Sequence, residues 1–333
     1  MRKGITVAGN MIVDNLYPIQ GLPGAGELTT ILDGISMATG GALCNCIVDL
    51  ARLDKTLPLI ALGRVGKDSQ GEEILSSLGQ YENIDLSQIK KEGITSFTAV
   101  MHDVTTTQRT FFHYRGANAA FSIDDIDFSL INSKIFHIGY ILLLDALDQE
   151  DDEFGTKMAR LLHDAQKSGL LTSFDVVSET SDRFTKFVPP AMRYADYCII
   201  NEIEAENSTS IKLRDDSGLL LLDNIPKALK KMKEMGVSRW AVIHSREGGY
   251  GLDENNQYFE IASLELPEGF IKGTVGAGDA FCSGVLYAAH EDKTLKEALE
   301  YGTATAAASL SMAGASEGVL PIDQVMELYE RYR

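Results

Sequence analysis

The 333-residue sequence predicts an α/β fold in which a mainly parallel β-sheet is covered by helices on both faces. Two observations lead to this expectation. Short β-branched runs alternate along the chain with segments of helical length and character. No internal repeat, low-complexity tract or Pro/Ser-rich linker divides the chain. We therefore expect one domain over residues 1–333.

The first repeating unit lies in the N-terminal part of the chain. ITVAGN (residues 5–10) is a strand-like run that ends in Gly and Asn, ALCNCIVDLARL (42–53) is helix-like, and LPLIALG (57–63) is strand-like again. Strand, helix, strand is the connection that parallel strands require.

The same unit recurs twice further along. KIFHIG (134–139) precedes an expected helix from Asp151 to Lys167, which starts with acids, ends with bases and is followed by Gly169 and the run LLTSFDV. YCIIN, an expected helix from Asp223 to Met235 and WAVIH form the next unit.

Two stretches do not follow the alternation. Residues 15–37 and 96–116 are rich in β-branched and aromatic residues with turn signals, and neither contains a convincing helix. We expect both to form a small β-sheet lid that leaves the main domain and returns to it. Because lid strands need an edge partner, this predicts a homodimer formed through the lid.

Composition restricts the partners. The formal net charge of −18 disfavours binding to nucleic acid or to an anionic membrane, and no window is apolar enough to span a bilayer. The N-terminal run lacks the uninterrupted apolar core of a signal peptide. Cys44, Cys46, Cys198 and Cys282 lie in apolar segments without metal-ligand spacing, which predicts core packing in a reducing cytoplasm.

The stretch GTVGAGDAFCSGVLYAA joins a glycine-rich turn to a buried helix that we expect to start at Gly278–Asp279. The glycines allow the N–H groups of Gly276, Ala277 and Gly278 to converge, which predicts an anion hole. Asp279 beside it could take a proton from a substrate hydroxyl during phosphoryl transfer. The alternative is that Asp279 only caps or complements the helix start. Phe281 excludes the dinucleotide fingerprint, and no P-loop motif occurs.

The run TVGAGDAF is similar to the C-terminal signature of the ribokinase-like, or PfkB, carbohydrate kinases. Further motifs of that family follow in order along essentially the whole chain: Gly9 with Asp14, ATGGALCN, GRVGKDSQG and NEIEA. The resemblance implies a three-layer α/β/α sandwich with a β lid. It also implies a kinase that uses ATP and Mg²⁺ to phosphorylate a small sugar.

The resemblance also implies residue roles on the sugar side. Asp14, which we expect at the end of the first strand, resembles the acid that binds two sugar hydroxyls, although Asp-Asn is also a common turn opening. Gly40 and Gly41 resemble the hinge on which the lid closes, and an ordinary helix entry is the alternative. Asn45 is an amide in an otherwise apolar helix, so it needs partners, and a sugar hydroxyl could be one. Apart from the resemblance, Arg109 and Arg115 flank FFHY in the expected lid, where Arg115 could contact a substrate carboxylate or phosphate; a solvated lid arginine is the alternative.

On the nucleotide side, the resemblance places Asn201 and Glu204 at a magnesium ion, which they hold through water, and adds a contact from Thr274. The alternative for Asn201 and Glu204 is a helix capping box. No histidine is assigned as a metal ligand or a base; His137 and His244 end strands and could line the cleft.

The chain departs from the family pattern at three positions. Gly273 replaces an Asp that commonly helps to bind a monovalent cation, so potassium activation is doubtful. Arg246 stands at an expected Gly, and Thr303 stands where an Asn often begins the adenine-side helix. A catalytically silent sugar-binding protein is therefore one alternative function.

The substrate is less constrained. Ala42 and Ile12 replace polar residues of ribokinase proper, so ribose is disfavoured, and GGA followed by Asn45 is more similar to fructokinases and 2-keto-3-deoxygluconate kinases. The lid arginines Arg109 and Arg115 suit an acid or a ketose. A nucleoside kinase of the same fold is the remaining alternative.

Overall fold

The computed structural model describes residues 2–178 and 182–333. Its described part is built around a nine-stranded sheet. Across the sheet the strands are β17 (Tyr258–Ala262), β16 (Gly248–Leu252), β15 (Trp240–Ser245), β14 (Tyr197–Asn201), β13 (Leu171–Val176), β10 (Ile135–Ile141), β1 (Ile5–Gly9), β4 (Leu59–Leu62) and β6 (Ile84–Asp85).

Seven neighbouring strands, β15 to β6 in that order, pair in parallel, and β16 and β17 add an antiparallel edge. The central strands β1, β10 and β14 are almost continuously buried, because helices cover both faces of a parallel sheet. The predicted mainly parallel α/β arrangement is confirmed.

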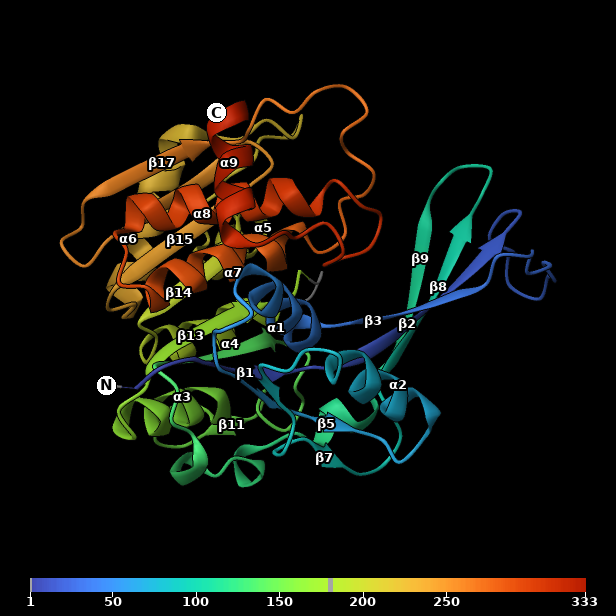
Figure 1. Cartoon of the computed structure of the whole chain (residues 1–333), viewed down its shortest axis with the longest axis horizontal. Coiled ribbons are helices and arrows are strands. Elements are labelled where there is room, and N and C mark those ends of the chain that lie inside the picture. The colour runs from blue at the N-terminus through green and yellow to red at the C-terminus, as the bar shows by residue number, and fades with distance from the viewer. Residues whose placement is uncertain (1, 179–181) are drawn as a thin grey trace.

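Helices form a layer on each face of the sheet (Figure 1). One core joins one face of the strands to α1 (Ala42–Leu53), α2 (Ser69–Leu78), α7 (Ala277–His290), α8 (Leu295–Ser309) and α9 (Ile322–Tyr332). A second core joins the other face to α3 (Lys157–Lys167), α4 (Phe184–Met192), α5 (Glu202–Thr209) and α6 (Ile225–Met235). Alternation along β14 shows the division, because Tyr197 belongs to the first core and Cys198 to the second.

The predicted start of the helix over residues 151–167 is wrong. The segment from Asp151 forms a short hairpin, β11 (Glu150–Asp151) with β12 (Gly155–Thr156), and α3 begins only at Lys157. The Asp151 carboxylate accepts a hydrogen bond from the backbone N–H of Phe154, 2.9 Å away, and so stabilises a turn, whereas the Thr156 hydroxyl caps the helix. The helix expected from Asp223 starts at Ile225, after a 3₁₀ turn.

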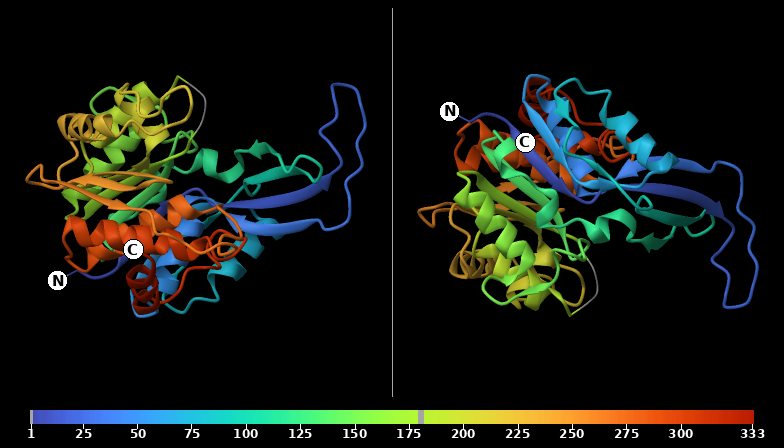
Figure 2. Two further views of the ribbon diagram at one scale, coloured as in Figure 1. Left: turned by 90° about the horizontal axis from the view of Figure 1, so that it is seen from above. Right: turned by 90° about the horizontal axis from the view of Figure 1, so that it is seen from below.

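A four-stranded sheet projects from the edge of the sandwich (Figures 1 and 2). Its order is β3 (Ser36–Gly40), β2 (Ile12–Ile19), β8 (Phe97–Asp103) and β9 (Arg109–Tyr114), and we call it the lid. β2 begins three residues before the expected segment 15–37.

The remaining short elements are β5 (Arg64–Val65), β7 (Lys90–Lys91) and the 3₁₀ turns η1 (Gly116–Ala120), η2 (Ile123–Asp125), η3 (Phe128–Leu130) and η4 (Leu222–Asn224).

All four cysteines are free and buried, in α1, β14 and α7. Over residues 2–178 and 182–333, none of the helices combines the length and the apolar character that a membrane crossing needs.

Candidate active site

A polar pocket of about 250 Å³ lies where the carboxyl ends of the parallel strands meet the start of α7. Crevices at the carboxyl ends of strands are the usual ligand sites of open α/β sheets. The lining residues are Tyr140, Asp175, Val176, Val177, Ser178, Asn201, Glu204, His244, Thr274, Gly276, Ala277, Gly278 and Asp279. The pocket therefore brings together the glycine turn, Thr274 and the Asn-x-x-Glu motif.

The glycine turn has the geometry that an anion hole needs. Gly276 has φ +77°, and a Cβ there would lie 2.6 Å from the carbonyl oxygen of Ala315, so only glycine fits. α7 begins at Ala277, one residue earlier than expected. The N–H groups of its first turn have no acceptor within the helix, and Ala277 and Gly278 line the pocket.

Asp279 lies in the first turn of α7 and is buried. No side chain caps this helix; instead the carboxylate contacts two other elements. Its Oδ1 accepts a hydrogen bond from the Tyr140 hydroxyl at 2.6 Å, and its Oδ2 accepts one from the Asn45 amide at 2.8 Å. Burial raises the pKa of Asp279, and these two hydrogen bonds oppose the shift.

Asn201 and Glu204 form a reciprocal capping box at the start of α5. The Asn201 side chain accepts hydrogen bonds from the backbone N–H groups of Ile203 and Glu204, and the Glu204 carboxylate accepts one from the backbone N–H of Asn201. Ser178 adds a hydroxyl donor to Glu204 at 2.7 Å. Asn201 and Glu204 therefore cap α5 and also line the pocket, so the capping function does not exclude a function in the pocket.

Three carboxyl groups gather in this pocket. Burial raises the pKa of Glu204 to about 7. Burial also raises the pKa of Asp175, and the nearby carboxylates of Glu204 and Asp279 raise it further. Within the described residues, no three His, Cys, Asp or Glu side chains are arranged to hold a metal ion by themselves. A cation here would need oxygen ligands from water or from a bound anion.

A larger cleft of about 720 Å³ continues from the same turn. Asn201, His244, Thr274, Ala277 and Gly278 line both cavities. The rest of this cleft is mostly apolar, from Leu264, Leu266, Ile271, Phe281, Ala306, Ala307 and Leu310. It can therefore accept a flat apolar group beside a charged one.

Two of the residues that differ from the family pattern, Arg246 and Thr303, lie at this larger cleft. Arg246 lies at the turn between β15 and β16, where its side chain is 76% exposed and pairs with Glu247. Thr303 lies inside α8 rather than at its start, and its buried hydroxyl has no hydrogen-bond partner among the described residues. Both residues line the larger cleft.

The lid contributes Asp14 from a different place than expected. Asp14 lies within β2, not at the end of the first strand, which stops at Gly9. It pairs in register with Thr98 of β8, which pairs with His113 of β9, so the three side chains share one face of the lid. The Thr98 hydroxyl and His113 Nδ1 lie 3.1 Å apart. Burial raises the pKa of Asp14.

Neighbouring atoms leave no room for a side chain at Gly40 and Gly41, the two glycines expected at the hinge. At Gly40, which ends β3, a Cβ would lie 2.8 Å from the Asp14 carboxylate. Gly41 has φ +90° and precedes α1, and a Cβ there would lie 2.6 Å from the Asn10 carbonyl oxygen. Asn45, in the first turn of α1, reaches Asp279 as described.

The two arginines of the lid, Arg109 and Arg115, lie in different environments. Arg109 is exposed at the start of β9. Arg115, after the end of β9, donates to the carbonyl oxygen of Leu142 at 2.8 Å and lies 3.7 Å from Asp145. The structure therefore brings Arg115, but not Arg109, to the segment that follows Tyr140.

Sequence reasoning missed several residues of the site: Tyr140, Asp175, Ser178, Thr98 and His113. Tyr140 and Asp175 come at the carboxyl ends of strand-like runs, which is the signal that could have identified them. Of the two histidines considered, His244 lines the cleft, whereas His137 is buried in β10 against Ser173.

At Gly273 there is no room for a side chain. A Cβ would lie 2.9 Å from the Ala313 carbonyl oxygen and 3.2 Å from that of Met312. The backbone of the 312–313 segment therefore occupies the place where an Asp side chain would begin.

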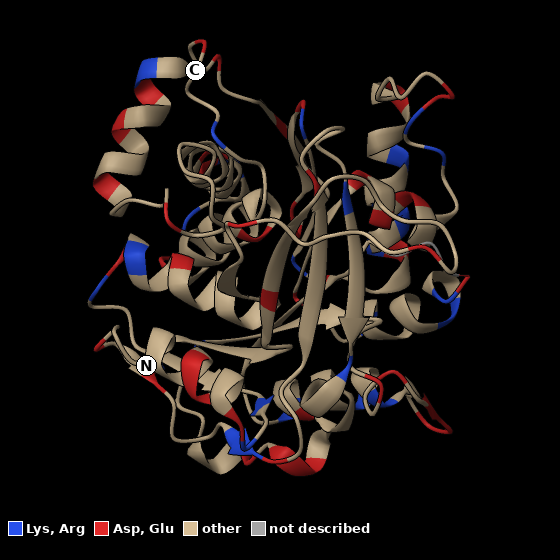
Figure 3. Cartoon of the chain, turned by 90° about the vertical axis from the view of Figure 1, so that its right-hand side faces the viewer, with Lys and Arg blue, Asp and Glu red and all other residues tan. Residues whose placement is uncertain are grey.

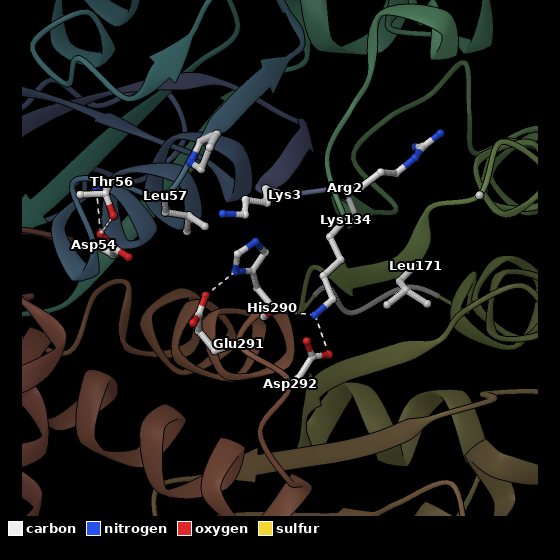
Figure 4. A pocket seen from close by; sticks show the side chains of 12 residues that line it. Arg2, Lys3, Asp54, Thr56, Leu57, Lys134, Leu171, His290, Glu291 and Asp292 are labelled. Atoms are coloured by element: carbon white, nitrogen blue, oxygen red, sulfur yellow. Dashed lines mark hydrogen bonds and ion pairs between the residues drawn. The ribbon is translucent and has the colours of Figure 1, made fainter.

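Another pocket, of about 630 Å³, lies at the amino ends of the central parallel strands (Figure 4). Two of its basic side chains bond to helix ends. Lys134 donates to the carbonyl oxygen of His290 at the end of α7, at 2.6 Å, and Arg2 donates to that of Ser168 after α3, also at 2.6 Å. These contacts are typical C-terminal helix caps.

The chain matches the family described as pfkB family carbohydrate kinase over residues 3–323. It is 25% identical over 306 residues to the 5-dehydro-2-deoxygluconokinase of Clostridium perfringens, covering 88% of this chain and 84% of that protein. It is 23% identical over 338 residues to the ribokinase of Haemophilus influenzae, covering 99% of each. The structure of Arabidopsis thaliana ribokinase complexed with ribose and ATP has a TM-score of 0.82 at 21% identity, over 99% of both chains, which shows a shared fold.

Proposed function

The chain belongs to the pfkB family of carbohydrate kinases, as its motifs predicted, and from that premise we propose that it phosphorylates a keto sugar acid. In the proposed reaction, ATP transfers its γ-phosphoryl group to a primary hydroxyl of the sugar, and the products are ADP and a sugar phosphate. The observation that carries the proposal is the buried Asp279 carboxylate in the first turn of α7, in the pocket that the glycine turn also lines.

Asp279 is the proposed base. It takes the proton of the acceptor hydroxyl as that oxygen bonds to the γ-phosphorus and the bond to the ADP oxygen breaks. The N–H groups of Gly276, Ala277 and Gly278 stabilise the charge on the transferring group. A protein that only bound sugar would not need a base beside an anion hole, which disfavours the silent alternative.

The larger cleft suits the nucleotide. Its apolar lining would hold the adenine, and Thr274 lies at the junction with the polar pocket, where the phosphates would meet the helix start. Asn201 and Glu204 would hold Mg²⁺ through water, since no described cluster ligates a metal alone. When bound, the ion would neutralise phosphate charge.

The sugar would lie between the lid and the sandwich. Asp14, Gly41 and Asn45 would contact its hydroxyls, with Gly40 as part of the hinge, and Arg115 would pair with a carboxylate. The relative from Clostridium perfringens is named for a keto sugar acid, and this name together with Arg115 favours an acid over a neutral hexose.

We also propose a homodimer in the cytoplasm, formed through the lid. The lid face opposite Asp14 carries exposed apolar side chains, including Met37, Phe112 and Tyr114. A second copy of this face would cover them.

The proposal is tested by measuring ADP release with MgATP over 5-dehydro-2-deoxygluconate, 2-keto-3-deoxygluconate, fructose, ribose and adenosine, each with and without potassium. We expect a keto sugar acid to be the best acceptor and potassium to have little effect, because Gly273 offers no carboxylate. Adenosine as the best acceptor would instead support a nucleoside kinase. ATP binding without any acceptor-dependent ADP release would support the silent alternative.

The catalytic assignment is tested by Asp279→Asn. We expect kcat to fall by about 100-fold or more while the KM for MgATP changes little, because the base is lost and the nucleotide cleft is kept. Asp216→Asn, an acid-to-amide change at a site that is 98% exposed, is the matched control and should retain full activity. Wild-type turnover by Asp279→Asn would remove Asp279 from the mechanism.

A further inference from the structure

We infer that Tyr140 is a positioning residue that holds the Asp279 carboxylate in the orientation that proton transfer requires. The inference rests on the proposed role of Asp279 as the base. Tyr140 lies outside the family motifs of the sequence. It contacts Asp279 from β10, on the strand side of the pocket.

The geometry fixes both carboxylate oxygens. Tyr140 donates to Oδ1 from β10 at 2.6 Å, and Asn45 donates to Oδ2 from α1 at 2.8 Å. Both distances are in the short range of hydrogen bonds to a charged acceptor. Because the two donors come from different elements, together they set the rotation of the carboxylate plane, which neither could set alone. Each oxygen keeps a lone pair for the acceptor hydroxyl.

Tyr140 is suited to remain a donor. The burial of its hydroxyl and the neighbouring Asp279 carboxylate both raise the pKa of Tyr140 well above its usual value. The hydroxyl therefore keeps its proton across the working pH range, and Asp279 remains the group that changes its protonation.

The other groups around Asp279 favour its protonated form. Asp175 from β13 and Glu204 from α5 line the same pocket, and Asp49 from α1 also interacts with Asp279 electrostatically. The thiol of Cys282 lies on the same helix and stays protonated, because its pKa is raised. His244 from β15 adds no positive charge near neutral pH, because burial lowers its pKa to about 4. Tyr140 and Asn45 are the side chains whose hydrogen bonds oppose these effects.

The test is the pH dependence of kcat/KM for the sugar in Tyr140→Phe, which removes one oxygen and keeps the ring. We expect kcat/KM near pH 7 to fall by about tenfold and the acidic limb of the profile to move up by about one pH unit, because one hydrogen bond to the carboxylate is lost. Activity should then recover in part near pH 9. The KM for MgATP should stay within about twofold.

Tyr287→Phe is the matched control. Tyr287 lies on the same helix α7, and its hydroxyl lies 3.5 Å from a carboxylate oxygen of Asp54, away from the pocket. Its profile should superimpose on that of the wild type. If Tyr140→Phe does not fold, Tyr140→Gln, which keeps an N–H donor, is compared with Tyr140→Leu, which has none. We expect the acidic limb of the Leu variant to lie above that of the Gln variant.

A Tyr140→Phe profile with an unmoved acidic limb, or one lowered equally at every pH, overturns the inference. Failure of the proposed function gives a different result, because Asp279→Asn would then be active. If Asp279→Asn is inactive while the acidic limb of Tyr140→Phe is unmoved, only the role of Tyr140 is wrong.

Discussion

Glu204 combines a structural contact with the proposed magnesium role. It completes the capping box of α5 through the backbone N–H of Asn201, at 2.9 Å, and its carboxyl group faces the polar pocket. If capping were its only function, Glu204 would not need to be buried, because a solvent-exposed side chain can cap a helix. The burial of Glu204, which raises its pKa to about 7, destabilises the ionised form that magnesium would need. The site therefore keeps a carboxylate at a cost in stability.

This cost predicts the behaviour of Glu204→Gln. Because the pKa is raised from 4.5 to about 7 in the folded protein, the stabilisation due to protonated Glu204 is complete below about pH 4.5. It is lost as the pH rises through about 7. Gln is always neutral and can still accept from the Asn201 N–H. We therefore expect the variant to melt about 2–5 °C higher than the wild type at pH 8, without ligands, and about equally at pH 5.

Calorimetry at the two pH values measures this difference. The same variant should lose at least about tenfold in kcat/KM for MgATP, because the water shell of the ion loses a charged acceptor. A melting difference that is the same at pH 5 and pH 8 would show that the ionisation of Glu204 does not control the effect.

Site residues that belong to a short sequence motif could be predicted from the sequence, whereas residues outside such motifs could not. Asp279 and Glu204 belong to motifs that can be recognised from the neighbouring residues alone. The contact of Asn45 with Asp279 joins positions 234 residues apart, and that of Tyr140 with Asp279 joins positions 139 apart. Such contacts depend on which strands become neighbours, which no local pattern specifies.

The lid exposes apolar side chains on both of its faces. One face carries Asp14, Thr98 and His113 together with Phe111, which is 64% exposed. The other face carries Met37 and Phe112, which are also exposed. Because the face with Asp14 is the one proposed to meet the sugar, the face with Met37 and Phe112 is the one left for a partner.

We therefore expect Phe112→Glu to convert the proposed dimer to a monomer while the Asp14 face is unchanged. A charge placed in an apolar interface would have to be desolvated, which lowers dimer affinity by about 100-fold or more. Sedimentation velocity over a concentration series measures this. Thr106→Glu, at the exposed turn between β8 and β9, is the control and should remain dimeric. A wild-type protein that is monomeric at every concentration would contradict the expectation itself.

Element types were more predictable than their ends. The strand-helix-strand alternation gave the parallel sheet, because buried strands and amphipathic helices differ in period. The hairpin β11–β12 was missed, since Asp151 and its acidic neighbours are equally typical of a helix start and of a turn. Asp14 was assigned to the wrong strand, because only Asn10 and Met11 separate β1 from β2.

At the scale of the whole molecule, charge is the dominant property. The formal net charge is −18, and Figure 3 shows acidic residues spread over the elements, with basic residues among them. The polar pocket itself holds Asp175, Glu204 and Asp279. MgATP and a sugar acid are both anions, so at long range the protein repels both of its proposed substrates. The attraction that remains is local, from Arg115 and the start of α7.

This balance predicts an unusual salt dependence. Raising the ionic strength from about 20 to about 200 mM shortens the Debye length to less than 10 Å, which screens the long-range repulsion more than the contacts within the cleft. We expect kcat/KM for the sugar acid to rise by about two- to fivefold while kcat stays constant, because the chemical step is governed by those contacts. The measurement uses tetramethylammonium chloride and is repeated with potassium chloride, so that a specific cation effect is separated from screening. A neutral acceptor at saturating MgATP is the control and should show little change. If kcat/KM for the acid instead falls with salt, the local positive potential of Arg115 and the helix start would outweigh the net charge of the whole protein.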